Sequence, residues 1–353
     1  MPTPAHSPSR RAVLKGGLAL SGALAFGGLD ALARREHPRE RPTLVVLWLN
    51  GGPAGLFNSA DAFLASGAFG VTSGNVRALG NGLYVDAGSL GALPDPALAH
   101  MAAVPFRHGM YSHNDARAAV LQAGPRSQLL RMAAALPASP VPCAVVNRLG
   151  FPVGVHADPP AEGGIRCRRV TDFATAREGL AVAEMEAIRH AYGVGPGQTA
   201  VDDQRATFAA VEALIRADAG VVFAQTAFTG REDRQFDTHH DDIGTVARGI
   251  MAPITPSLSV FLQRMLALRG RNVVTLLTGE FSRTLPGADH AKGGTATVIG
   301  KYVRTGTAGR QLPDGSPPED AQPPEALWAY LAAALRVEGA SPFGAHPYAH
   351  LLV

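Results

Sequence analysis

The sequence is poor in charged residues and in cysteine, and it has no long apolar run. Charged residues make up 17% of the 353 residues and hydrophobic residues 46%, so the chain can bury a sizeable core. No run of lysine and arginine interleaved with aromatic residues occurs, and such runs are the mark of nucleic-acid binders. The net charge is +3, of which residues 1–33 carry +2. Nucleic acid is therefore excluded as a partner.

The N-terminal segment has the features of a twin-arginine export signal. Arg10 and Arg11 precede an apolar run over 16–29, and residues 31–33 form an A-x-A cleavage site. The apolar run of about 14 residues is shorter than the roughly 20 that span a bilayer. We expect 1–33 to be a signal peptide and 34–353 to be a single domain without a transmembrane span. The twin-arginine machinery would deliver this domain, already folded, to the periplasm or the cell exterior.

Cysteine is limited to Cys143 and Cys167. An oxidising compartment permits a disulfide between them, and in the chain-entropy model the bond adds about 3 kcal/mol to stability. However, Cys143 stands in an apolar run typical of a buried strand, which favours two buried thiols. The sequence leaves both interpretations open.

Short apolar runs alternate with helical patterns along the rest of the chain, and no internal repeat occurs. The run Leu44–Leu49 is continuous, as a central parallel strand requires. The alternation predicts an α/β fold, a mostly parallel sheet with helices on both faces. The expected strands are 44–49, 143–146, 220–225, 273–278 and 296–299, and the expected helices are 116–136, 174–192, 203–217, 243–268 (interrupted by Pro253 and Pro256) and 324–337.

Polar clusters stand at the ends of several expected strands. Ligands of open α/β sheets gather at the carboxyl ends of the strands, so these clusters are expected to converge on one rim. They are Asn50-Gly51-Gly52, Asp237-Thr238-His239-His240, Gly279-Glu280-Phe281-Ser282-Arg283 and Asp289-His290.

Three of these clusters suggest a metal site. Asp237 and His239 are two residues apart, so in an extended segment both side chains point to one side. Glu280, Asp289 and His290 would add carboxylate and imidazole groups. Oxygen and nitrogen ligands without cysteine favour a divalent ion such as zinc, manganese or calcium over an iron–sulfur cluster. The alternative is that each short pattern belongs to an ordinary surface loop.

Ser112 precedes an expected helix and has two interpretations. It is a candidate nucleophile beside a helix N-terminus, where backbone N–H groups favour a phosphate or sulfate. Alternatively it is an N-cap, with Asp115 completing a capping pattern. Arg283 likewise either clamps a substrate oxyanion or pairs with a carboxylate. His113 and His240 are further candidates beside these groups.

Taken in order, the motifs resemble an exported bacterial family known as domain of unknown function 1501, whose members are similar to the alkaline phosphatase and sulfatase superfamily. The resemblance extends from about Leu44 to the C-terminus. The matching stretches are the twin-arginine leader, Leu47-Trp48-Leu49-Asn50-Gly51-Gly52-Pro53, Ser112-His113-Asn114-Asp115-Ala116, Phe236-Asp237-Thr238-His239, Gly279-Glu280-Phe281-Ser282-Arg283-Thr284 and Ala288-Asp289-His290.

The resemblance implies an alkaline-phosphatase-like sheet and a metal-dependent hydrolase of phosphate or sulfate esters. Ser112 would be the nucleophile, and Arg283 would neutralise charge on the transferred group. The metal candidates would be Asp237, His239, Glu280, Asp289 and His290.

The chain departs from the pattern in three places. The superfamily places a metal-binding Asp after the first strand, where this chain has Gly52-Pro53-Ala54-Gly55. It places Asp-His where this chain has Glu280-Phe281, and the family usually has Gly where this chain has Ser282. These departures motivate an alternative function: a non-catalytic exported binding or assembly protein that keeps the fold and at most one structural metal.

Overall fold

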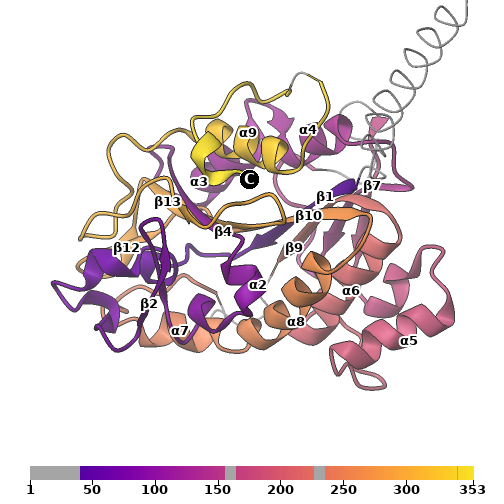
Figure 1. Cartoon of the computed structure of the whole chain (residues 1–353), viewed down its shortest axis with the longest axis horizontal. Coiled ribbons are helices and arrows are strands. Elements are labelled where there is room, and N and C mark those ends of the chain that lie inside the picture. The colour runs from indigo at the N-terminus through magenta and orange to yellow at the C-terminus, as the bar shows by residue number, and fades with distance from the viewer. Residues whose placement is uncertain (1–39, 156–163, 226–234, 340) are drawn as a thin grey trace, which may run out of the picture. The chain divides into compact units, whose positions relative to one another are not determined.

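The fold is built on a sheet of eight strands, seen in a computed structural model (Figure 1). The structure describes residues 40–155, 164–225, 235–339 and 341–353. The expected leader 1–33 lies outside these ranges. The strands, in spatial order, are β14 (Gly306–Thr307), β4 (Met101–Arg107), β13 (Gly293–Ile299), β10 (Arg271–Thr278), β1 (Arg41–Trp48), β9 (Ala219–Gln225), β7 (Val141–Val146) and β8 (Cys167–Val170).

The sheet is mostly parallel, and this confirms the expected fold class. Only β13 runs antiparallel to its neighbours β10 and β4. All five expected strands are present. Three strands of the sheet, β4, β8 and β14, are not evident in the sequence pattern: β4 carries a proline, β8 has two central arginines, and β14 is two residues long.

Both faces of the sheet are covered, which explains the continuous apolar runs. In β1, Val45 and Leu47 join one core cluster, whereas Leu44, Val46 and Trp48 join the other. Helices α6 (Gln204–Arg216) and α8 (Ile254–Leu266) contribute to the first cluster, and α3 (His113–Leu121), α4 (Gln128–Ala135) and α9 (Pro324–Ala334) contribute to the second (Figure 1). Successive strand residues face opposite layers, so a strand covered on both faces is apolar at most of its positions.

Three expected helices are each divided in two. The pattern over 116–136 contains α3 and α4, which are separated by the hairpin β5 (Gln122–Ala123) and β6 (Arg126–Ser127). The pattern over 174–192 contains a 3₁₀ helix at Phe173–Arg177 and α5 (Val182–Ala191). Gly124 and Gly179 have positive φ in these breaks, a conformation that a helix interior does not accommodate. The pattern over 243–268 divides at Pro253 into α7 (Thr245–Met251) and α8.

The remaining described strands and α-helix lie outside the main sheet. They are the hairpin β2 (Val76–Gly80) and β3 (Leu83–Asp86), the short helix α2 (Asp95–Leu98), and the hairpin β11 (Arg283–Thr284) and β12 (Asp289–His290). Short 3₁₀ helices occur at Gly55–Phe57, Ala60–Phe63, Ala68–Gly70, Leu90–Ala92 and Ala349–Leu351. In the described part of the chain no single helix is long and apolar enough to span a membrane; only α7 and α8 together, bent by 46° at their junction, meet that criterion of length and composition.

The two cysteines lie opposite each other on the neighbouring strands β7 and β8. Both are buried, and their sulfur atoms are 3.3 Å apart as free thiols. The structure thus shows two buried thiols, and the pairing register places them within reach of each other.

One edge of the sheet gathers the polar clusters. Asn50 and Glu280 follow β1 and β10 at their carboxyl ends. Because β13 is antiparallel to β10, its first residues lie at the same edge, directly after β12. The strand β4 also ends there and leads into α3. This edge is where the candidate site forms.

Candidate metal centre

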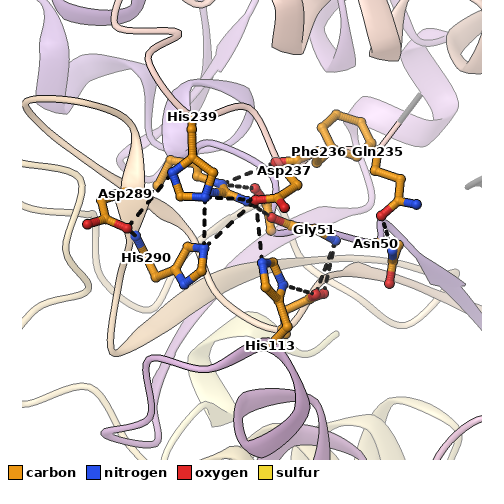
Figure 2. Close-up of polar contacts among 12 residues, drawn as sticks. Asn50, Gly51, His113, Gln235, Phe236, Asp237, His239, Asp289 and His290 are labelled. Carbon is orange, nitrogen blue, oxygen red and sulfur yellow. Dashed lines mark hydrogen bonds and ion pairs between the residues drawn. The ribbon is translucent and has the colours of Figure 1, made fainter. Parts of the chain in front are cut away.

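The centre is organised around one carboxylate oxygen, Oδ1 of Asp237. The Nε2 atoms of three histidines lie around it, at 3.1 Å for His239, 3.4 Å for His113 and 3.8 Å for His290. The Nε2 atoms of His239 and His290 are 3.2 Å apart. Figure 2 shows the three rings pointing toward the Asp237 carboxylate. Side chains from three separate segments thus bring four potential ligand atoms together.

These separations fit a bound ion. Ligand atoms about 2.0–2.2 Å from a tetrahedral zinc lie roughly 3.3–3.6 Å from one another. Two overlapping sets of three residues have ligand atoms within 4.8 Å of one another: His113, Asp237 and His290, and His239, Asp289 and His290. Since the sets share His290, the described residues form one continuous cluster rather than two separate sites.

Asp237 is positioned by close backbone packing against the end of β1. The backbone N–H of Phe236 donates to the carbonyl of Asn50 at 2.7 Å, and the Phe236 ring is buried. Gly51 has φ +97°, and a Cβ there would lie 2.3 Å from the backbone nitrogen of Asp237. Only glycine accommodates both the conformation and the contact.

Arg283 holds Asp237 from the interior of the protein and has no exposed surface. Its Nη2 donates to Oδ1 of Asp237 at 2.6 Å and also to the carbonyl of Gly51. Nε donates to the carbonyls of Gly52 and Phe236, both at 3.1 Å, and Nη1 donates to the carbonyl of Ala288 at 3.2 Å. Of the two roles that the sequence allowed, the geometry shows carboxylate pairing, because protein oxygens engage every nitrogen of the guanidinium.

The electrostatics favour the protonation states that metal binding requires. Burial raises the pKa of Asp237, but the hydrogen bond and charge of Arg283, with smaller contributions from His113 and His239, lower it below its ordinary value. Burial lowers the pKa of His290, and the charge of Arg283 lowers it further against the opposing hydrogen bond to Tyr111. Ionised carboxylate and neutral imidazole are the ligand forms of these groups.

His290 and His113 are each held through the nitrogen that faces away from Asp237. Nδ1 of His290 lies 2.7 Å from the carbonyl oxygen of Tyr111, and Nδ1 of His113 lies 2.8 Å from Oε1 of Glu280. The Tyr111 carbonyl only accepts, and Oε1 of Glu280 also receives the backbone N–H of Gly51, so Nδ1 is the donor in both contacts. A neutral ring with its hydrogen on Nδ1 keeps its lone pair on Nε2. This is the usual arrangement of metal-binding histidines.

The structure brings together some of the expected site residues and separates others. Asp237, His239 and His290 meet at the centre, and Glu280 lies behind His113 rather than among the converging atoms. Asp289 is exposed, 3.9 Å from Nδ1 of His239.

Ser112 and His240 lie outside the converging atoms. Ser112 is the N-cap of α3: its Oγ accepts the N–H of Asp115 at 3.2 Å and donates to the Asp115 carboxylate at 2.6 Å. His240 has an exposed side chain and φ +64°.

His113 contributes more to the centre than its sequence pattern indicates, because its Nε2 is one of the converging atoms. The sequence pattern marks it only as a neighbour of Ser112 and not as a metal candidate. The unpredicted strand β4 and the start of α3 place it at the sheet edge. The apolar residues of 101–107 are the sequence signal for this placement, because a strand there puts residues 108–113 at the same edge of the sheet.

No protein-family model matches this chain, and no curated protein matches it. Among solved structures it is similar to the lipoteichoic acid synthase LtaP from Listeria monocytogenes, with 10% identity and a TM-score of 0.41 over 87% of this chain and 75% of that one. The phosphonate monoester hydrolase SpPMH from Silicibacter pomeroyi is 9% identical, with a TM-score of 0.41 over 89% and 76%. Ps i-CgsB in complex with a neocarrahexaose is 9% identical, with a TM-score of 0.41 over 87% and 75%. Likenesses this distant carry no information on activity.

Proposed function

We propose that this protein is an exported, metal-dependent hydrolase of phosphate or sulfate esters. The observation that carries the proposal is the convergence of three imidazole Nε2 atoms within 3.8 Å of Oδ1 of Asp237. A single ion would be held by His113, Asp237, His239 and His290. The twin-arginine leader and delivery to the periplasm or cell exterior belong to the same proposal and rest on the sequence motif alone.

The donor set bears on which ion binds. Calcium takes six to eight oxygen ligands, whereas this cluster offers three imidazole nitrogens and one carboxylate oxygen. Imidazole-rich sites suit zinc and related transition metals, so zinc or manganese fits these residues better than calcium. When bound, such an ion stabilises the negative charge that develops on a phosphoryl or sulfuryl group.

In this proposal Ser112 is the nucleophile and Asp115 its proton acceptor. Oγ of Ser112 lies 2.6 Å from Oδ2 of Asp115, within reach for proton transfer. Oγ would bond to phosphorus or sulfur while the bond to the ester oxygen breaks, and the proton would pass through Asp115 to the leaving alcohol. Water would then hydrolyse the seryl ester, release the inorganic anion and restore Ser112. Arg283 would keep the Asp237 carboxylate oriented throughout.

A second candidate function is a non-catalytic binding or assembly protein with one structural metal. Two observations favour it: the hydroxyl of Ser112 makes the hydrogen bonds of a helix cap, and protein oxygens engage the guanidinium of Arg283. Both groups then act within the protein rather than on a substrate.

The experiment that separates these functions starts with metal content, measured by mass spectrometry on the exported protein. The Asp237→Ala, His239→Ala double variant should lose a stoichiometric ion, and His240→Ala, a change to an exposed neighbour, should retain it. Hydrolysis of p-nitrophenyl phosphate and p-nitrophenyl sulfate is then measured on the same preparations.

Metal with ester hydrolysis supports the hydrolase, and metal without hydrolysis of either ester supports the binding protein. A folded wild-type protein that binds no ion would overturn the metal centre itself.

A further inference from the structure

Glu280 is a carboxylate with no exposed surface, at the end of β10 and directly behind the candidate metal centre. Burying a charged group is costly unless donors satisfy its oxygens. A carboxylate retained in such a place therefore needs partners that compensate its charge.

The partners of Glu280 are hydrogen-bond donors. The backbone N–H of Gly51 lies 3.2 Å from both carboxylate oxygens, and Nη2 of Arg117 lies 3.4 Å from Oε1. Nδ1 of His113 is the nearest, at 2.8 Å from Oε1. An oxygen that receives a backbone N–H and a guanidinium acts as an acceptor, so the hydrogen between Glu280 and His113 sits on the histidine.

Two of the donors to Glu280 come from helix α3. His113 and Arg117 are four residues apart and lie on one face of the helix, which explains why both reach Glu280. Arg117 also donates to Oδ1 of Asn50 at 3.0 Å. On the other side, Nε2 of His108 lies 2.7 Å from the backbone carbonyl of Glu280. Both the side chain and the backbone of Glu280 are thus tied down.

We propose that Glu280 is a positioning residue that makes His113 a metal ligand through Nε2. This inference rests on the proposed metal centre and assigns Glu280 a role behind the ligand rather than as one. By accepting the Nδ1 hydrogen, Glu280 fixes the tautomer and the ring orientation, and it increases the electron density on Nε2. That atom lies 3.4 Å from Oδ1 of Asp237, where an ion bound by both would fit.

The test compares zinc affinity, measured by competition with a chelator, in the full chain and in Glu280→Gln. Loss of a carboxylate behind a metal-binding histidine weakens binding by about 10- to 100-fold, and we expect that range. Glu212→Gln is the matched control, because Glu212 is also fully buried and bonded to arginines but lies in α6. The control should bind zinc as the wild type does.

Two further measurements show that the effect passes through His113. In a His113→Ala background, adding Glu280→Gln should change zinc affinity little, because coupled residues are not additive. The visible spectrum of the cobalt-substituted protein reports the ligands of the ion. His113→Ala should show the loss of one imidazole ligand, and Glu280→Gln should weaken the band that this ligand produces.

The outcomes separate this inference from the proposed function. Wild-type protein that binds no zinc overturns the metal centre, whereas wild-type affinity in Glu280→Gln overturns only the positioning role. If Glu280→Gln does not fold, isotope-edited NMR of the imidazole nitrogens in the wild type decides. A His113 that is protonated at Nδ1 and binds zinc through Nε2 supports the role, and the opposite tautomer overturns it.

Discussion

The guanidinium of Arg283 lies 2.6 Å from Oδ1 of Asp237, and that same oxygen faces the three histidines. Arg283 is fully buried, whereas the Asp237 side chain is 38% exposed. The pair therefore joins a rigid support to a group open to solvent. The hydrogen bond and the positive charge of Arg283 also lower the pKa of the Asp237 carboxyl group against the opposing effect of burial. This keeps Asp237 ionised, the form that binds a cation.

Replacing Arg283 with methionine should destabilise the protein strongly. The carbonyls of Gly51, Gly52, Phe236 and Ala288 would lose this donor, and each buried acceptor that is left unsatisfied costs about 1–3 kcal/mol. Urea unfolding at neutral pH measures the loss. Arg148→Met, which removes an ion pair with Asp202 that is exposed on both sides, is the control and should cost about 1 kcal/mol or less. Equal stability of the two variants would contradict the structural role of Arg283.

Replacing Gly51 with alanine should damage the centre as well as the fold. The added Cβ would meet the backbone nitrogen of Asp237 at 2.3 Å, so this backbone must move and zinc affinity should fall at least tenfold. Gly80→Ala is the control that separates backbone strain from steric clash. Gly80 has a similar φ of +102°, but a Cβ there would meet no neighbouring atom. That control should lose stability by about 1 kcal/mol and keep its zinc affinity. Unchanged zinc binding in Gly51→Ala would show that Asp237 does not depend on this contact.

Changing Ser112 to asparagine should separate its two roles. Asparagine caps helices as well as serine does, so the unfolding free energy should stay within about 0.5 kcal/mol of wild type. The variant lacks the hydroxyl, and the proposed ester hydrolysis should disappear. Ser112→Ala should lose both hydrolysis and about 1 kcal/mol of cap stability. Normal turnover by the asparagine variant would exclude Ser112 as the nucleophile.

The buried network around Glu212 should make stability depend on pH. Burial raises the pKa of Glu212, but hydrogen bonds from Arg264, Arg216 and Tyr192 outweigh it and hold the pKa below its usual 4.5. A depressed pKa gives stability that is present above about 4.5 and is lost as the pH falls through the folded-state value.

Glu212→Gln should therefore be less stable than wild type by about 3 kcal/mol at pH 7, and the difference should shrink below pH 4.5. Unfolding curves at several pH values test this. A difference that does not change with pH would mean that the carboxylate charge contributes nothing.

The thiols of Cys143 and Cys167 should form a disulfide in an oxidising compartment. They lie in register on adjacent strands, 3.3 Å apart and 24 residues apart in sequence. Closing this loop should add about 3 kcal/mol of stability, which reduction or the Cys143→Ala, Cys167→Ala double variant would remove. Thiol titration of the denatured, exported protein measures the bond. Two free thiols in protein kept under oxidising conditions would contradict the prediction.

The sequence alone was enough to establish the α/β class of the fold. Runs such as Leu44–Leu49 are apolar at every position. A strand that is covered on both faces has this pattern, whereas a strand with one exposed face alternates. The same local logic identified Asp237 and His239 as neighbours on one segment. It also proposed that the polar clusters at strand ends converge, and all four do meet at one edge.

Only the tertiary structure decided the part each side chain plays there. His113 and Glu280 are 167 residues apart, and nothing local to either residue shows that one lies behind the other. The same holds for Arg283, whose buried contacts come from loops elsewhere in the chain. Sequence periodicity reports which face of a strand or helix is apolar, whereas ligand geometry depends on distances between elements set by packing of the whole sheet edge.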